Sequence, residues 1–187
     1  MTDQAASSDP AVSAPEVTQD FRRTVGSFPT GVCVVTSEHN GRHAGMTLNS
    51  FTSISLEPLL VLVSLGHGSR TLATVRSSGR FAVSMLHRGQ REIAVDFGVR
   101  SEAFPEERVR RTDEGFLLVR HPLAYLLCEV HEFVEAGDHD LVIGRVLDFG
   151  AESGEPLVFH AGRFGGVAPD AAAPAGFTDF FDEGIGW

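Results

Sequence analysis

A run of neutral polar side chains between two apolar segments is the stretch of this chain best suited to binding chemistry. It lies within residues 45–58 and carries Thr47, Asn49, Ser50, Thr52, Ser53 and Ser55. A strand that only builds a core does not need so many donors and acceptors, because each buried polar group must find a partner or cost stability. The run therefore predicts a bound molecule that is polar, planar and rich in hydrogen-bonding atoms. A hairpin exit whose hydroxyls bond the local backbone is the alternative.

A second candidate site follows at residues 67–71, which read His-Gly-Ser-Arg-Thr. A glycine, two hydroxyls and an arginine at a helix start can cradle a phosphate. The helix end offers N–H groups and partial positive charge, and Arg70 adds a charged fork. Ser69 can also be an ordinary N-cap, and the two roles are compatible.

Two more stretches carry residues suited to ligand contact. Gly137, Asp138 and His139 lie at a junction between two predicted strands, ahead of Gly144. A glycine–aspartate turn with a solvent-facing histidine is the simpler interpretation. Residues 90–97 have helical spacing and end on Phe97, which can line a planar ligand or fill the core.

Arginines offer a further set of candidate phosphate partners outside these stretches. Arg91 and Arg100 lie in and just after the helical segment. Either can equally be a solvated surface charge.

These stretches together resemble the motifs of the flavin reductase family, the FMN-binding split-barrel proteins. Residues 45–58 resemble G-x-T-x-[NS]-[SA]-F-x-S-x-S-x-x-P, and residues 137–144 resemble G-D-H-x-x-x-x-G. Residues 90–97 resemble Q-x-x-x-A-x-x-F, and residues 69–71 resemble an S-x-T that lies near the flavin phosphate. The resemblance covers about residues 19–167. It implies a mainly β fold, a split β-barrel with a few short helices.

The resemblance also implies the binding residues and the assembly. FMN or FAD would bind near the subunit interface of a homodimer, and His139 would position the nicotinamide of NADH or NADPH on the open face of the flavin. No residue is nominated as a general acid or base, because the chemistry belongs to the two cofactors. The implied cofactor-binding residues are Thr47, Leu48, Asn49, Ser50, Ser53, Ser55, Ser69, Arg70, Thr71, Phe97, Gly137, Asp138 and His139.

The implied activity is an NAD(P)H:flavin oxidoreductase, which reduces the flavin by hydride transfer and supplies it to a separate flavin-dependent monooxygenase. Two alternatives stay open. One is a flavin-binding electron-transfer or sensor protein without NAD(P)H turnover, and the other is a structural barrel that binds no flavin.

The composition limits the classes of protein to which this chain can belong. The formal net charge of −10 argues against non-specific binding of nucleic acid or anionic membranes. Cys33 and Cys128 lie inside apolar runs and read as small buried hydrophobes. The first residues lack the features of a signal peptide, and no apolar run reaches the ~20 residues of a membrane span. We therefore expect a cytoplasmic protein. The remaining histidines lack metal-ligand spacing, so no metal site is predicted.

The 187 residues fit one domain with tails. Residues 1–17, rich in Ala, Ser and Pro, are predicted to be disordered, and residues 18–167 form the domain. Residues 168–187 form an acidic and aromatic tail. It is either disordered, or its apolar residues dock on the barrel, cover the flavin site or bind a partner.

The elements that must position the candidate residues are mostly strands. Residues 38–41 contain an Asn-Gly turn, and residues 59–65 are apolar enough for burial on both faces. Residues 99–115 look like an irregular surface excursion. Helices are predicted at residues 21–25, 71–76 and 90–97. Asp20 would cap the start of the first and Ser69 the start of the second, which Gly79 would end. Strands are predicted at residues 31–36, 42–48, 59–65, 81–86, 123–135, 141–149 and 156–164.

Overall fold

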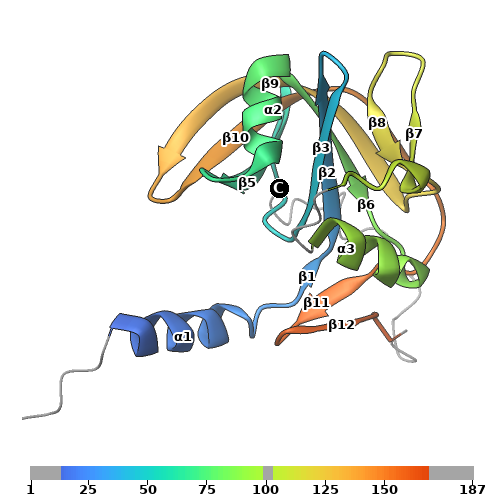
Figure 1. Ribbon diagram of the computed structural model, residues 1–187. Coiled ribbons are helices and arrows are strands. Elements are labelled where there is room, and N and C mark those ends of the chain that lie inside the picture. Colours follow the sequence, from blue (N-terminus) through green and yellow to red (C-terminus); the bar gives the residue numbers. More distant parts are fainter. Residues whose placement is uncertain (1–13, 99–102, 169–187) are drawn as a thin grey trace, which may run out of the picture.

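One curled antiparallel sheet organises the chain in the computed structural model, which describes residues 14–98 and 103–168 (Figure 1). The strand order is β3-β2-β6-β9-β10-β5-β4. The outer strands β3 and β4 are not ladder partners of each other within the described residues, so the barrel is split there. The predicted mainly β fold is confirmed. The seven strands are β2 (Cys33–His39), β3 (Arg42–Leu48), β4 (Thr52–Leu56), β5 (Leu59–Gly66), β6 (Arg80–Met85), β9 (Ala124–Ala136) and β10 (His139–Ala151).

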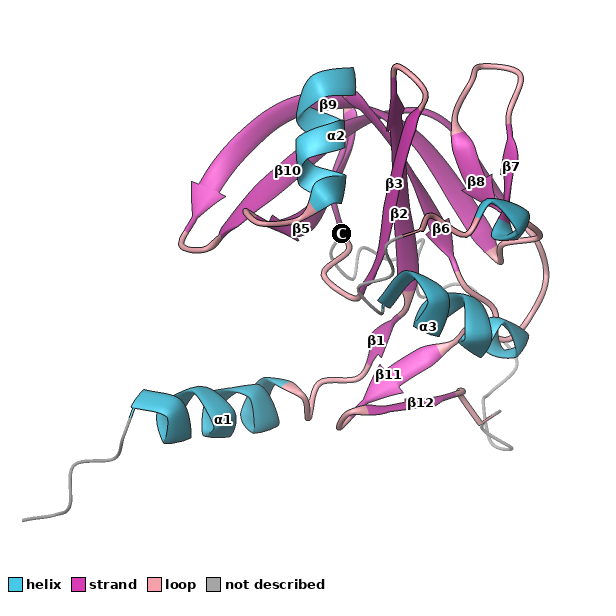
Figure 2. Cartoon of the chain, in the orientation of Figure 1, coloured by secondary structure: helices cyan, strands magenta, loops and turns pink. Residues whose placement is uncertain are grey.

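Short helices and two small sheets complete the fold (Figure 2). Helix α2 (Arg70–Ser78) packs on β2 and β3, and helix α3 (Arg91–Gly98) packs on β3. A hairpin of β7 (Val109–Arg111) and β8 (Leu117–Val119) flanks the large sheet. The remaining elements are α1 (Ala14–Val25), β1 (Thr30–Gly31), β11 (Val158–His160), β12 (Arg163–Gly165) and the 3₁₀ helices η1 (Arg88–Gln90) and η2 (Glu106–Arg108).

The core forms on both faces of β2. Cys33 and Val35 point into one apolar cluster with Val63, while Val34 points into a second cluster with Leu117. The continuous apolar run of this strand therefore reflects burial on both sides. The hairpin to β3 turns at Asn40 and Gly41, both with positive φ, as the Asn-Gly pair predicts.

Strand β5 differs from its prediction of burial on both faces. Val61, Val63 and Leu65 are buried, whereas the alternate residues are partly exposed and Leu59 is 40% exposed. The outward face of β5 therefore remains open in one copy of the chain.

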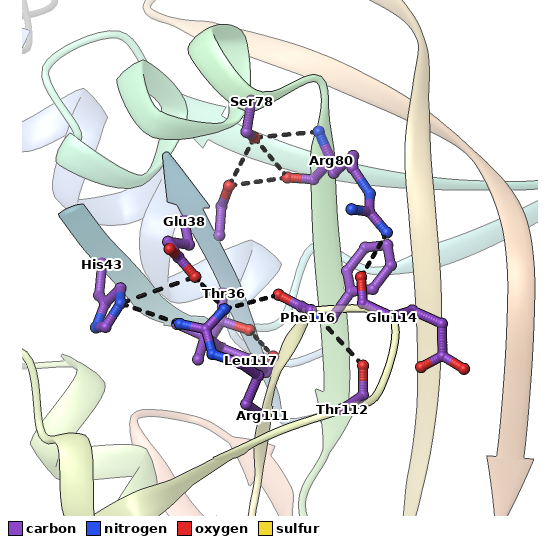
Figure 3. Close-up of polar contacts among 12 residues, drawn as sticks. Thr36, Glu38, His43, Ser78, Arg80, Arg111, Thr112, Glu114, Phe116 and Leu117 are labelled. Carbon is purple, nitrogen blue, oxygen red and sulfur yellow. Dashed lines mark hydrogen bonds and ion pairs between the residues drawn. The ribbon is translucent and has the colours of Figure 1, made fainter. Parts of the chain in front are cut away.

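The predicted surface excursion at residues 99–115 is only partly right in its described part, most of which is exposed and irregular. Residues 109–111 form strand β7, and Val109 is buried in the second core cluster. The β7–β8 hairpin is tied to the large sheet by polar contacts, in which Thr36 Oγ1 donates to the carbonyl of Leu117 and Arg111 pairs with Glu38 (Figure 3). Strands of three residues are too short for alternation to reveal them.

The N-terminal helix is longer than the sequence predicts. It begins at Ala14, so residues 14–17 are helical rather than part of a disordered tail. Asp20 is not its cap but lies inside it and pairs with Arg23 at 3.1 Å. Helix α1 extends away from the rest of the fold (Figure 1). Its apolar side chains Val17 and Phe21 are more than half exposed.

Two strand predictions need correction. Residues 52–56 form an edge strand, β4, that was not predicted, and residues 156–164 contain a turn at Ala161 and Gly162 rather than one strand.

The prediction for the two cysteines is confirmed. Cys33 and Cys128 are buried and free, and burial raises the pKa of each thiol to about 12.

Some predictions fall where the structure gives no description. Arg100, residues 1–13 of the N-terminal tail and residues 169–187 of the C-terminal tail lie outside the described residues. No helix in the described ranges is long and apolar enough to cross a bilayer.

Candidate functional site

A cleft of about 670 Å³ lies between β3, the β5–α2 connection, α3 and the start of β10. It collects residues from all four sequence stretches, although these lie far apart along the chain. The predicted site residues that line it are Thr47, Ser69, Arg70, Thr71, Phe97 and His139. The fold therefore places the separate motifs around one volume.

The wall formed by β3 and α3 depends on a close contact between Gly45 and Phe97. A Cβ atom on Gly45 would lie 2.7 Å from Cε1 of Phe97, so only glycine fits. The Phe97 ring is almost fully buried and packs edge-on against Phe104, with the ring centroids 5.5 Å apart. Thr47 Oγ1 donates to the carbonyl of Ala94 at 2.7 Å and fixes α3 to the strand. The wall therefore combines the backbone of Gly45, the ring of Phe97 and the hydroxyl of Thr47, which is already bonded to α3.

The second wall is the N-terminal end of α2. Ser69 is the N-cap, as predicted, and its Oγ accepts the Leu72 N–H at 3.1 Å. Gly79 ends the helix with φ of 67°, also as predicted. Arg70 is exposed at the helix start and Thr71 is buried behind it. A helix N-terminus that borders a cleft beside an arginine suits an anionic group.

The third wall is His139 at the start of β10. Gly137, with φ of 64°, and Asp138 form the turn that presents it, but neither lines the cleft. The imidazole Nδ1 lies 2.7 Å from Asp138 Oδ1, and its Nε2 would be 3.5 Å from a Cβ atom on Gly66. The hydrogen bond from His139, followed by its charge, holds the pKa of Asp138 below its usual range. The ring therefore lies over the backbone of β5 with a fixed orientation.

The rest of the polar run lies outside the cleft. Leu48 is buried in the core, and the amide of Asn49 donates to Thr30 Oγ1 at 3.1 Å. Ser50 bonds both the N–H and the carbonyl of Ser64, at 3.1 and 3.2 Å. Asn49 thus bonds a side-chain hydroxyl and Ser50 the backbone of the neighbouring strand β5. The contact of Leu48, Asn49 and Ser50 with a flavin stays a prediction.

The two serines of β4 are also held by local geometry. Ser55 Oγ accepts the Glu57 N–H at 3.2 Å, and Ser53 pairs with Val61 in the β4–β5 ladder. Neither lines the cleft. Their contact with a flavin stays a prediction.

His43 lines the cleft but was not predicted, because the sequence places it beside a turn. Its Nδ1 lies 2.5 Å from Glu106 Oε1, and its ring packs edge-on against Phe104 at 5.5 Å. Its Nε2 lies 3.8 Å from Glu38, which pairs with Arg111 from the β7–β8 hairpin (Figure 3). The Arg111 hydrogen bond holds the pKa of Glu38 below its usual range. No sequence spacing signals this cluster, since its members meet only through the fold.

Comparison with known proteins agrees with these motifs. Residues 25–168 match the family model described as flavin reductase like domain. The chain is 33% identical over 163 residues to the flavin-dependent monooxygenase reductase subunit HsaB of Mycobacterium tuberculosis strain H37Rv, covering 85% of this chain and 87% of that protein. It is 37% identical over 158 residues to an NADH-dependent FAD reductase of Streptomyces globisporus, covering 81% and 86%.

A solved structure supports the same assignment. The fold is similar to that of the Streptomyces globisporus C-1027 NADH:FAD oxidoreductase SgcE6 in complex with NAD and FAD fragments. The TM-score is 0.80 at 36% identity, covering 87% of this chain and 99% of that chain. The resemblance inferred from the motifs is confirmed, and the chain belongs to the flavin reductase like domain family.

Proposed function

We propose that this protein is an NAD(P)H:flavin oxidoreductase that reduces FMN or FAD by hydride transfer. The observation that carries the proposal is the convergence of Thr47, Ser69–Thr71, Phe97 and His139 on one cleft. The similar proteins named as NADH-dependent FAD reductase and as NADH:FAD oxidoreductase support this reaction. They also favour NADH over NADPH and make FAD a first choice for testing.

The cleft residues fit a flavin by chemical type. The α2 N-terminus with Ser69 and Arg70 suits the phosphate, because helix N–H groups and a guanidinium favour an anion. The wall of Gly45, Thr47 and Phe97 suits a planar ring, since it combines a glycine backbone, an aromatic ring and one hydroxyl. Flavin and nicotinamide nucleotide together supply the hydride chemistry, so the chain has to bind and orient them.

His139 is proposed to position the nicotinamide rather than to move a proton. Its Nδ1 is engaged by Asp138, and its ring is 46% exposed at the cleft wall. A half-exposed ring with a fixed orientation can pack against a second planar group that enters from solvent. The nicotinamide of the reductant is the group that must lie there for hydride transfer to a flavin in the same cleft.

The assembly and the partner belong to the same proposal. Exposed apolar side chains on β4, β5 and β10 support a homodimer, because exposed apolar surface marks sites of protein–protein contact. They are Ile54, Leu56, Leu59, Leu147 and Phe149. The name of the relative HsaB supports a separate flavin-dependent monooxygenase that receives reduced flavin. We place the reaction in the cytoplasm, in keeping with two free, buried cysteines.

The test is the loss of nicotinamide absorbance with NADH or NADPH, with and without FMN, FAD or riboflavin. Oxidation that requires added flavin would establish the reductase, and the fastest pair would define its specificity. Flavin binding without oxidation of either nucleotide would replace the proposal with an electron-transfer or sensor role. If the protein bound no flavin, the remaining hypothesis would be a structural barrel.

A variant of His139 tests its role within the same assay. His139→Ala should raise KM for the nicotinamide nucleotide by about tenfold while leaving flavin affinity nearly unchanged, because the ring contributes binding on one side only. His131→Ala, on the exposed part of β9, is the matched control. Equal loss of flavin and nucleotide affinity would assign His139 to the flavin instead.

A further inference from the structure

A buried carboxylate lies directly behind the cleft wall that His139 forms. Asp140 follows His139 in β10, and the pleat directs successive side chains to opposite faces. The Asp140 side chain is only 2% exposed and shares the buried face with Val142. A buried charge without partners would be strongly destabilising, so its contacts reveal what it holds.

Asp140 joins two segments that come from elsewhere in the chain. Its Oδ1 accepts a hydrogen bond from His67 Nε2 at 3.1 Å, and its Oδ2 pairs with Arg76 of α2. The Arg76 guanidinium is also held over the ring of Phe133 in β9, 4.5 Å from the centroid. The carboxylate therefore connects β10 to the β5–α2 connection and to α2 itself.

Backbone contacts bring the same two segments together at the cleft. The His67 N–H donates to the carbonyl of Asp138 at 3.0 Å, and Gly66 is the ladder partner of His139. His67 immediately precedes the Gly68-Ser69 stretch that lines the cleft at the N-terminus of α2. One carboxylate thus lies behind both the phosphate end of the cleft and the histidine end.

We infer that Asp140 is a positioning residue that fixes the N-terminal end of α2 relative to His139, and so sets the distance between the two ligands. The inference rests on the proposed function for its kinetic consequence. Its structural part does not depend on turnover. This part states that His67 and Asp140 hold the β5–α2 connection and the turn between β9 and β10 in one arrangement. If the ion pair only stabilised the fold, its loss would lower the unfolding temperature without loosening both segments together.

Amide hydrogen exchange of the full chain tests the structural content. In His67→Ala, peptides covering residues 66–72 and residues 136–141 should both exchange faster than in the unsubstituted protein. In His67→Gln, whose side-chain N–H₂ can still donate to Asp140, protection should be largely retained. Faster exchange confined to residues 66–72, or equal protection in both variants, would overturn the inference. His67 is exposed enough, at 41% of its side chain, for both variants to fold.

Steady-state kinetics tests the functional consequence. His67→Ala and Asp140→Asn should lower kcat/KM for NADH on the order of ten- to a hundred-fold, because small misplacements of reacting groups have effects of that size. His67→Gln should recover most of the loss. Glu129→Gln, which removes the half-exposed ion pair with Arg145 farther along β10, is the control and should leave kcat/KM unchanged.

The two assays separate failure of this inference from failure of the proposed function. If the unsubstituted protein binds flavin but oxidises no nicotinamide nucleotide, the proposed reductase activity is wrong. The exchange experiment would still decide whether His67 and Asp140 hold the two segments together. An active enzyme whose kcat/KM is unchanged in His67→Ala would overturn the positioning role.

Discussion

The ring of Phe97 in α3 lies against the backbone of Gly45 in β3, where a Cβ atom would be only 2.7 Å from its Cε1. This contact determines where α3 lies relative to β3, and hence the width of the cleft between them. The position of the Phe97 ring therefore depends on the absence of a side chain at Gly45, which links the first motif to the helical motif. The sequence pattern separates them by about fifty residues.

Replacing Gly45 with alanine should displace Phe97 and narrow the cleft. We expect Gly45→Ala to weaken flavin binding about tenfold or more, and to lower the free energy of unfolding by about 1–3 kcal/mol, as for other overpacked sites. Flavin fluorescence titration and denaturant unfolding measure the two effects. Flavin affinity equal to that of the unsubstituted protein would show that Phe97 does not border the flavin.

Gly144 provides a matched control for that experiment. A Cβ atom there would overlap the ring of Phe81 in the core, and Gly144 does not line the cleft. Gly144→Ala should therefore destabilise the protein by a similar amount, about 1–3 kcal/mol, with little direct effect on flavin affinity. The result would also explain the last glycine of the Gly-Asp-His motif as a packing requirement.

Ser69 combines a helix cap with a position on the cleft. Ser69→Ala removes the acceptor for the Leu72 N–H and should cost about 1 kcal/mol of stability. If the α2 N-terminus holds the flavin phosphate, the variant should lose affinity for FMN while its affinity for riboflavin, which has no phosphate, changes little. Isothermal titration with both flavins measures the difference.

A second serine of α2 controls for the loss of a hydroxyl. Ser77 Oγ donates to the carbonyl of Ala73 at 2.9 Å near the other end of the helix. Ser77→Ala should leave both flavin affinities unchanged. Equal losses of FMN and riboflavin affinity in Ser69→Ala would mean that Ser69 supports the loop without contacting the phosphate.

The sequence predicted the parts of the site that depend on local rules. The N-cap at Ser69, the C-cap at Gly79 and the turn at Asn40 and Gly41 follow from propensities within a few residues, and all three are confirmed. The long hairpin of β9 and β10 follows from its apolar runs. The order of the motifs was sufficient to identify the family.

What the sequence did not predict lies where distant segments determine the contacts of a residue. The hydroxyl of Ser50 looks like a ligand group in sequence, yet it bonds Ser64 because β5 lies beside it. His43 looks like a turn residue, yet Phe104 and Glu106 place it in the cleft. Asp140 received no role from the sequence, yet His67 and Arg76 both contact its buried carboxylate. No spacing along the chain encodes such contacts, since each needs the complete topology.

The Glu38–Arg111 pair predicts a stability change in acid. Arg111 lowers the pKa of Glu38 in the folded protein below its ordinary value of 4.5. The ionised carboxylate therefore contributes stability above that pH, and the contribution is lost as the pH falls through the lower, folded-state pKa. Glu38→Gln should be less stable than the unsubstituted protein at neutral pH, and the difference should shrink in acid.

Thermal unfolding of the two proteins at neutral pH and below pH 4.5 measures this effect. Glu155→Gln is the control, because its ion pair with Arg88 is more than half exposed on both sides and should contribute little. A stability difference between Glu38→Gln and the unsubstituted protein that stays constant with pH would assign the pair a packing role instead.

The apolar face of α1 predicts how the proposed homodimer forms. Val17, Phe21 and Val25 follow one another at four-residue spacing, and each is at least half exposed in a helix that extends away from the fold (Figure 1). An amphipathic helix gains most of its stability from packing this face against another surface. We expect a second copy of the chain to supply that surface, through the exposed apolar side chains of β4, β5 and β10.

Phe21→Ser should therefore weaken the dimer. Burying a phenylalanine contributes about 1.5–3 kcal/mol, and a two-fold symmetric dimer contains the contact twice, so the dimer Kd should rise on the order of a hundred-fold or more. Sedimentation velocity over a concentration series measures the change. Gln19→Ser, on the opposite face of the helix, should leave the Kd unchanged. If Phe21→Ser and the unsubstituted protein dimerise equally, α1 is not part of the interface.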